Sequence, residues 1–289
     1  MLFKKRKGPV LTAVEIQSPI GKAVNYLLLG ILSIMVLGPI FIVFNGSFKG
    51  NEEYMYSGIF ELPKNFTLIN YQQVVEKGKM LLAFKNTVIL IVISVFLSVM
   101  LGSMVAYVLG RFNFKHKKLI LLLFLIPTFI PSITTQVATF SIIKGLGLFN
   151  TRLAAILIYA GADITQIYIF LQFMDNIPYS LDESAVIEGA SYFKIYRSII
   201  LPQLKPAMAT VIILKVIGIY NDMLTPYLYM PKTSLKTVST ALMSFSSDQN
   251  SQWNIMGAGI MAVMVPTLVL YLFLQKFIFA GITDGAVKE

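Results

Sequence analysis

The segment ESAVIEGASYFKIYRSIILP, residues 183–202, is the most polar and most patterned stretch in the second half of a strongly apolar chain. It opens on the carboxylate of Glu183, carries Gly189 near its middle and ends on Pro202. On either side lies an apolar run long enough to cross a bilayer, since a transmembrane helix needs about 20 mostly apolar residues. The segment is therefore predicted to be a polar connection between two membrane spans.

The composition is that of a membrane protein. Of the 289 residues, 56% are hydrophobic and 13% are charged, whereas soluble domains carry about 45–50% apolar and about 25% charged residues. The net charge of +10 does not indicate nucleic acid as a partner, because most basic residues lie at the edges of apolar runs. The absence of cysteine excludes disulfides and cysteine-based metal sites. His116, the only histidine, is interpreted as part of a charged loop beside the lipid headgroups.

Six apolar runs have the length of a transmembrane helix. They are residues 23–44, 87–109, 119–143, 153–174, 208–230 and 257–279. The first is too long for a signal peptide and no small-residue cleavage site follows it, so it is interpreted as a retained span. We therefore expect an all-α, polytopic membrane protein with an N-terminal segment (1–22), a transmembrane domain (23–279) and a C-terminal tail (280–289).

The basic residues predict the direction of the spans. With six spans both termini lie on one side, and the segments on that side hold more Lys and Arg residues than those on the other. The compact basic clusters at residues 4–7 and 115–118 both fall there. The positive-inside rule then places both termini in the cytoplasm. The segment 183–202, between the fourth and fifth spans, consequently faces the cytoplasm as well.

The start of this segment carries signals for a short helix. Pro178 ends the fourth span, because proline lacks the amide donor and disfavours helix in its predecessor. Ser180 and Glu183 have the spacing of a capping box, in which each side chain accepts a hydrogen bond from the other's backbone amide. The small residues Ala185 and Gly189 would let another surface approach closely. Spacing alone leaves open that Glu183 is only a cap and Gly189 only a turn.

The segment resembles the cytoplasmic signature of permease subunits of binding-protein-dependent ABC importers. That signature reads Glu-Ala-Ala, three residues, Gly, nine residues, then Ile-x-Leu-Pro, and all of its spacings are matched here. The matching residues are Glu183, Ser184, Ala185, Gly189, Ile199, Leu201 and Pro202. Ser184 departs from the signature, but it is small like the alanine it replaces. The resemblance implies a type I ABC importer permease fold, in which the loop of about 176–205 docks a coupling helix into a cytoplasmic ATPase.

Two further stretches are similar to the carbohydrate branch of this family. Tyr220, Asn221 and Asp222, with Pro226 four residues on, resemble an aromatic-Asn-Asp-x-x-x-Pro pattern of sugar permeases. The ending GITDGAVKE, residues 281–289, is similar to that of the maltose-type second permease. The resemblance implies uptake of a sugar, with an oligosaccharide preferred and glycerol phosphate as the alternative solute. It also implies a bacterial plasma-membrane complex with a second permease, an ABC ATPase dimer and an extracellular sugar-binding protein.

The chain carries no motif of its own for using ATP. Its two Gly-Lys pairs, at Gly21 and Gly78, do not continue to the Ser or Thr of a phosphate-binding P-loop. We therefore expect a transport subunit rather than an enzyme, with no catalytic residue, metal or cofactor, and with ATP and Mg held by the partner ATPase. A secondary carrier driven by an ion gradient is the alternative class, although such carriers commonly show related halves or recurring broken helices.

Polar residues within the spans are candidates for a hydrated solute path, because an Asp or Lys at mid-bilayer costs about 2.5–3.5 kcal/mol and usually faces the bundle interior or water. The candidates are Asp163, Gln166, Tyr220, Asn221 and Asp222. Each polar residue also has a structural interpretation. Asn221 and Asp222 would shape the fifth span near its proline, and Asp163 would pair with a partner subunit.

Three further expectations concern neighbouring polar residues. Lys215, in the fifth span, is expected either to line the same path or to extend towards the cytoplasmic surface. Gln136, a weaker path candidate, lies in a third span that Pro127 and Pro131 should kink. The outer loop 231–256, before the sixth span, carries the polar stretch 244–250 and is expected either to meet the binding protein or to be an ordinary solvated loop.

Overall fold

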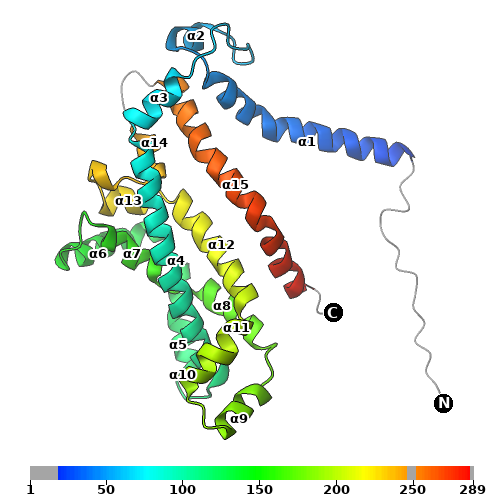
Figure 1. Cartoon of the computed structure of the whole chain (residues 1–289), viewed down its shortest axis with the longest axis vertical. Helices are drawn as coiled ribbons and strands as arrows, with labels where there is room; N and C mark the ends of the chain where they lie inside the picture. The colour runs from blue at the N-terminus through cyan, green and yellow to red at the C-terminus, as the bar shows by residue number, and fades with distance from the viewer. Residues whose placement is uncertain (1–18, 246–251, 287–289) are drawn as a thin grey trace.

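The computed structural model describes residues 19–245 and 252–286, and all regular secondary structure in these ranges is helical, as predicted (Figure 1). The elements in chain order are α1 (Pro19–Gly46), α2 (Asn51–Tyr56), α3 (Ile69–Glu76), α4 (Met80–Arg111), α5 (Lys117–Leu125), η1 (Ile126–Phe129), α6 (Ser132–Gly145), α7 (Arg152–Ala160), α8 (Ile164–Met174), α9 (Ser180–Ile187), α10 (Tyr192–Ile195), η2 (Tyr196–Ile200), α11 (Leu201–Gln203), α12 (Lys205–Asn221), α13 (Leu224–Tyr229), η3 (Thr233–Leu235), α14 (Val238–Met243) and α15 (Trp253–Ala286). The basic cluster 4–7, residues 246–250 of the polar stretch and the last three residues of the chain lie outside the described residues.

Helices α1 and α4 are each long and apolar enough to cross a membrane without a break. Figure 1 shows that α1 lies near the other helices at its C-terminal end, and that its N-terminal end projects away from them. None of the side chains in its most apolar stretch is buried. An apolar helix exposed on all sides requires lipid or another protein around it.

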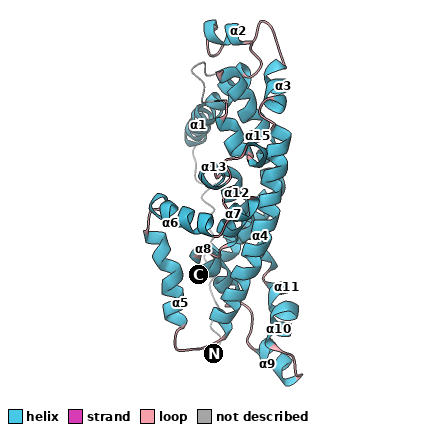
Figure 2. Ribbon diagram, turned by 90° about the vertical axis from the view of Figure 1, so that its left-hand side faces the viewer, coloured by secondary structure: helices cyan, strands magenta, loops and turns pink. Residues whose placement is uncertain are grey.

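The predicted third and fourth spans are each built from two helices that meet at a bend. The bend is 108° between the α5–η1 run and α6, and 44° between α7 and α8. Pro127 lies in η1 and Pro131 is the N-cap of α6, so the predicted kink is confirmed. It is so sharp that α6 turns across the molecule rather than continuing α5 (Figure 2).

The predicted fifth span is also interrupted, whereas the predicted sixth is longer than expected. Helix α12 ends at Asn221, and α13 begins at Leu224 after a break at Asp222. The helix expected over 257–279 extends from Trp253 to Ala286 as α15, with Pro266 inside it. The bend at Asp222 follows from contacts with other helices, which are described with the polar residues below.

Helix α4 is the central element of the described part of the chain, because it contributes to each of the three clusters of buried apolar side chains found there. Met80 and Ala83 join one cluster with α14 and α15, and Leu90 joins a second with α7 and α13. Val99 and Ala106 join the third, which includes α8, α12 and the segment around α10. Figure 1 shows α4 running along the length of the molecule. Its 32 residues span about 48 Å at 1.5 Å per residue.

A buried polar network joins the end of α1 to α3 and α15, at the end of the molecule that carries α2 (Figure 1). Asn70 donates through Nδ2 to the carbonyls of Ser47 and Lys49, at 2.8 Å each. Asn254 donates to Oδ1 of Asn70 at 3.0 Å. The Lys49 ammonium, itself buried, donates to the Ser57 hydroxyl at 2.8 Å. These bonds fix the end of α1 against the beginning of α15.

Candidate coupling segment and polar path

Residues 176–205 form a series of short helices at the opposite end of the molecule, where α9 lies (Figure 1). The predicted capping box is wrong: Tyr179 is the N-cap of α9, and no side chain caps the helix. The reason is that the Leu181 amide already donates to the Pro178 carbonyl, at 3.3 Å. Ser180 therefore lies within the first turn, and the Glu183 amide donates to the carbonyl of Tyr179 at 3.1 Å.

Gly189 ends α9 in a Schellman motif. Its φ is +76°, its amide donates to Val186 O at 2.9 Å, and the Ala190 amide donates to Ala185 O at 2.9 Å. This pair of bonds, with a left-handed residue just after the C-cap, defines the motif. A Cβ on Gly189 would meet no atom of this chain within 4 Å. Within the chain, glycine is therefore required by backbone conformation and not by close packing.

The residues of the predicted coupling segment divide between an inner and an outer face of α9. Ala185 is only 7% exposed and packs into the core cluster of α4, α8 and α12. Glu183 and Ser184 are exposed. Between them and Glu188 lies Ile187, which is 87% exposed. Sequence reasoning missed Ile187, although an isoleucine in the middle of a polar loop is a usable signal.

This outer face can act as an apolar contact bordered by carboxylates. Val186 and Ile187 are both exposed, and Glu183 and Glu188 lie beside them in the chain. Burying an aliphatic side chain of this size contributes about 1.5–3 kcal/mol. The last signature residues have a different setting: Ile199 and Leu201 are half-buried, and Pro202 lies in the first turn of α11. The helical run they complete meets α12 at 75°.

Gln166 lies between α8 and α4. Its side chain is 1% exposed, donates through Nε2 to Ser98 O at 2.6 Å and accepts from the Ser98 hydroxyl at 3.0 Å. Gly102 makes room for it, because a Cβ there would lie 2.1 Å from Nε2 of Gln166. In this conformation Gln166 ties two helices together, and its contact with solute stays a prediction.

Asp163 and Lys215 form an ion pair between α8 and α12. Their Oδ2 and Nζ atoms are 2.7 Å apart, and Nζ also donates to Gly161 O at 3.3 Å. Asp163 is in addition the N-cap of α8, accepting from the Gln166 amide at 2.9 Å. The expectation that Lys215 extends to the cytoplasmic surface is wrong, because a carboxylate of the same chain lies within reach and pairs with it.

Asp222 holds the break between α12 and α13. Its Oδ2 accepts from the Tyr159 hydroxyl at 2.9 Å, and its Oδ1 accepts from the Thr225 amide at 3.1 Å. Its carbonyl accepts from the Ser239 hydroxyl at 2.7 Å. Asp222 thus connects four helices, α7, α12, α13 and α14, which agrees with the structural interpretation of this residue.

The other polar candidates have contacts of their own. The Tyr220 hydroxyl donates to Val263 O on α15 at 2.9 Å. Asn221 is exposed, and its Nδ2 donates to Ile217 O one turn earlier, at 3.0 Å. Gln136 accepts from the buried Tyr229 hydroxyl at 2.6 Å. Asn221 is therefore accessible, as is Asp163, whose side chain is 50% exposed.

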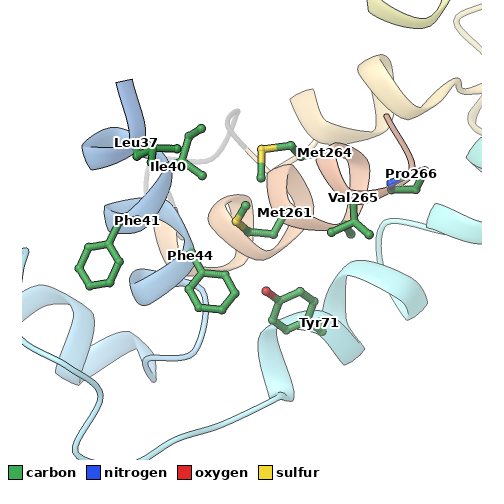
Figure 3. A pocket seen from close by; sticks show the side chains of 10 residues that line it. Leu37, Ile40, Phe41, Phe44, Tyr71, Met261, Met264, Val265 and Pro266 are labelled. Carbon is green, nitrogen blue, oxygen red and sulfur yellow. The ribbon is translucent and has the colours of Figure 1, made fainter. Parts of the chain in front are cut away.

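A cavity of about 650 Å³ lies between the C-terminal half of α1 and α15 (Figure 3). It is lined by Leu37, Ile40, Phe41, Phe44, Tyr71, Met261, Ala262, Met264, Val265 and Pro266. The Tyr71 hydroxyl is already hydrogen-bonded to the Ser47 hydroxyl, at 2.8 Å. Sugar hydroxyls require polar partners, so this cavity suits an apolar neighbour and not a sugar.

Comparison with known proteins identifies the family. The sequence profile described as binding-protein-dependent transport system inner membrane component matches residues 98–283. A probable starch degradation products transport system permease protein, AmyC of Thermoanaerobacterium thermosulfurigenes, is 33% identical over 262 residues, which is 90% of this chain and 94% of that protein. The melibiose/raffinose/stachyose import permease protein MelC of Bacillus subtilis (strain 168) is 30% identical over 252 residues, 86% of this chain and 91% of that protein.

A solved structure confirms the fold. A chain in the crystal structure of a bacterial ABC transporter involved in the import of the acidic polysaccharide alginate superposes with a TM-score of 0.79, at 22% identity, over 89% of this chain and 96% of that chain. The resemblance predicted from residues 183–202 is therefore confirmed. With its type I ABC importer permease fold, the chain belongs to the family of binding-protein-dependent transport system inner membrane components and is a multi-pass protein of the inner membrane.

Proposed function

We propose that the chain is a permease subunit of an ATP-driven oligosaccharide importer and forms half of its translocation path. The observation that carries this proposal is the similarity, over nearly the full length, to permeases named for starch degradation products and for raffinose-type sugars. The aromatic-Asn-Asp pattern at Tyr220 supports the same solute class. The family is one of transport components, so this chain is a transport subunit and not itself an enzyme.

The proposed topology has six spans with both termini in the cytoplasm. It is supported by α1 and α4, the two bent pairs α5–α6 and α7–α8, the helix α12 with the short α13 after it, and α15. Residues 1–22 and 280–289 are then the cytoplasmic ends of a transmembrane domain of 23–279. In this arrangement α9 lies on the cytoplasmic side and α2 on the outer side.

The proposed partners follow from the exposed surfaces. An ABC ATPase dimer, which holds ATP and Mg, binds the outer face of α9 through Glu183, Ser184 and Ile187. A second permease completes the path, and an apolar surface for it or for lipid is supplied by α1. A sugar-binding protein delivers solute at the α2 side, by analogy with the structurally similar bacterial alginate ABC transporter, whose crystal structure is of a complex with an alginate pentasaccharide-bound periplasmic protein.

Transport then proceeds by alternating access. ATP-driven closing of the ATPase dimer displaces α9, and this displacement shifts the permease between inward-open and outward-open states. The pairs Asp163–Lys215 and Tyr159–Asp222 join helices near their breaks. A change between these states that moves the helices would alter both contacts. No step of the chemistry of ATP is assigned to this chain.

The proposal is tested by uptake into proteoliposomes that contain the chain, its co-purifying ATPase and second permease, and the binding protein. Uptake of maltodextrin or raffinose is expected with ATP and without any ion gradient. Uptake that follows an ion gradient in the absence of ATP would indicate a secondary carrier. Uptake of glycerol phosphate but of neither sugar would contradict the proposed solute class.

A further inference from the structure

Helix α9 is fastened to the end of α4 by one arginine. Arg111 is the last residue of α4, and its side chain is only 5% exposed. Its Nη2 donates to the carbonyl of Ile177 at 3.0 Å. Its Nε lies 2.7 Å from Oδ2 of Asp182, in the first turn of α9.

Tyr179, the N-cap of α9, adds two more contacts to the same place. The Arg111 guanidinium lies over its ring, with 4.3 Å between Cζ and the ring centroid. The Tyr179 hydroxyl donates to the carbonyl of Gly110 at 2.9 Å. A planar guanidinium can stack on a ring, donate a hydrogen bond to a carbonyl and form an ion pair with a carboxylate together, which a lysine ammonium cannot reproduce. These contacts therefore fix the orientation of α9 as well as its position.

The N-terminal part of α4 is also joined to other segments by hydrogen bonds. Asn86, which is fully buried, donates through Nδ2 to the carbonyls of Ser234 and Lys236 at 2.9 Å each. Its Oδ1 accepts from Nη2 of Arg152 at 2.7 Å. The 32-residue helix α4 thus makes polar contacts near both of its ends, with α9 at one and with the segment before α14 at the other.

We propose that Arg111 is a positioning residue that locks α9 to α4, so that displacement of α9 by the ATPase moves α4 as a rigid unit. This inference rests on the proposed function. Without Arg111, Ala185 still packs into the core and the outer face of α9 is unchanged, so the ATPase still binds. What is lost is the direct transfer of motion from α9 to the central helix, and ATP is then hydrolysed with little solute movement.

The burial of Asp182 indicates that the Arg111–Asp182 pair serves to orient α9 more than to stabilise the fold. Burial raises the pKa of Asp182, and the Arg111 guanidinium opposes that rise without cancelling it. A buried ion pair commonly contributes little net stability, because desolvation of both charges offsets their attraction. The pair is then retained for the geometry that it imposes.

The test uses the complete complex in proteoliposomes and measures solute moved per ATP hydrolysed. The variants are R111M, the double variant R111M/D182N, which leaves no unpaired buried carboxylate, and K118M, an exposed lysine in the first turn of α5, as the matched control. Both Arg111 variants are expected to retain the ATPase on co-purification and to lose about tenfold in solute per ATP, within the range of ordinary coupling between sites. K118M is expected to behave as wild type.

A second measurement reports the distance between α9 and α4 and does not depend on transport activity. Because the chain has no cysteine, spin labels can be placed at E188C on α9 and V108C on α4, both exposed positions. A single narrow distance is expected with Arg111 present, with and without ATP, and a broadened distribution with R111M/D182N.

The possible results separate the two proposals. An unchanged transport ratio and an unchanged distance distribution in the double variant would overturn the locking role. Loss of the ATPase from both Arg111 variants would also overturn it, because Arg111 would then merely maintain the docking surface. Solute movement by the wild-type chain in the absence of any ATPase would refute the proposed function itself.

Discussion

Lys215 and Asp163 lie 52 positions apart in the sequence and are joined by an ion pair of 2.7 Å between Nζ and Oδ2. The pair connects the middle of α12 to the N-cap of α8, and Nζ also donates to Gly161 O at the break after α7. Unpaired charges are costly within a span. The pair therefore stabilises the bend between α7 and α8 by giving both charges a partner.

Replacement of Lys215 by methionine should destabilise the detergent-solubilised protein, because it leaves Asp163 without a counter-ion. We expect a loss of more than about 1 kcal/mol, which exceeds the effect of an ordinary surface pair. The double variant D163N/K215M should recover most of the loss. The measurement is the thermal midpoint of each variant, with K118M as a control for an exposed lysine. Equal midpoints for K215M and wild type would contradict a structural role of the pair.

Replacement of Ile187 by serine should weaken binding of the ATPase and leave the fold intact, since the side chain is almost fully exposed. Loss of about 1.5–3 kcal/mol of apolar burial corresponds to about a 10- to 150-fold higher Kd. Binding to the permease in nanodiscs measures this directly. L62S removes an exposed leucine (68%, against 87% for Ile187) at the α2 end and should leave the Kd unchanged. Identical affinities for I187S and L62S would show that the ATPase does not cover this face.

Replacement of Gly189 by alanine should strain the end of α9, because a residue with a Cβ costs about 1–2 kcal/mol in the left-handed conformation. G189N should be milder, since asparagine tolerates that conformation. The matched control is G145A, in which the added Cβ also meets nothing within 4 Å but no positive φ is required. ATPase co-purification should fall in the order G145A, G189N, G189A. A normal yield with G189A would mean that the turn can be rebuilt at no cost.

The stability of the α9 end should depend on pH through Asp182. Its pKa is raised in the folded protein, chiefly by burial, so the folded state holds this proton more tightly than the unfolded chain. The favourable contribution is therefore full below the ordinary Asp pKa of about 3.9 and is lost as pH rises through the raised value. Thermal midpoints should be measured for wild type and D182N across this acidic range. The difference between the two midpoints should change with pH, because D182N lacks the titrating carboxyl group. Parallel pH curves for the two proteins would exclude it.

The sequence predicted the class and the family of this protein because both depend on features that lie close together in the chain. Apolar runs identify membrane helices whatever their neighbours, and the spacing from Glu183 to Pro202 is a local pattern. The Schellman turn at Gly189 is local as well, and a turn was one of the two interpretations considered.

Contacts between distant segments could not be predicted in the same way. The break at Asp222 depends on Tyr159 and Ser239, which belong to other helices. The anchoring of α9 depends on Arg111 at the end of α4, whose partners Ile177 and Asp182 follow more than 60 positions later in the chain. The pairing of Asp163 with Lys215 could have been inferred from the sequence, because each of two opposite charges in successive apolar runs costs free energy unless it has a partner. The capping box was wrong for a local reason. The Leu181 amide donates to the Pro178 carbonyl, so the helix begins one residue earlier than a Ser180 N-cap would allow.

The bonds among Asn70, Asn254 and the end of α1 have a geometric consequence for the two long apolar helices that they join. Helices α1 and α15 meet at one fixed vertex and separate from there (Figure 1). Any change in the angle between them must therefore be smallest at Lys49 and largest towards Pro19. The cavity between these helices can thus widen or narrow to fit different neighbours while its apex keeps the same shape.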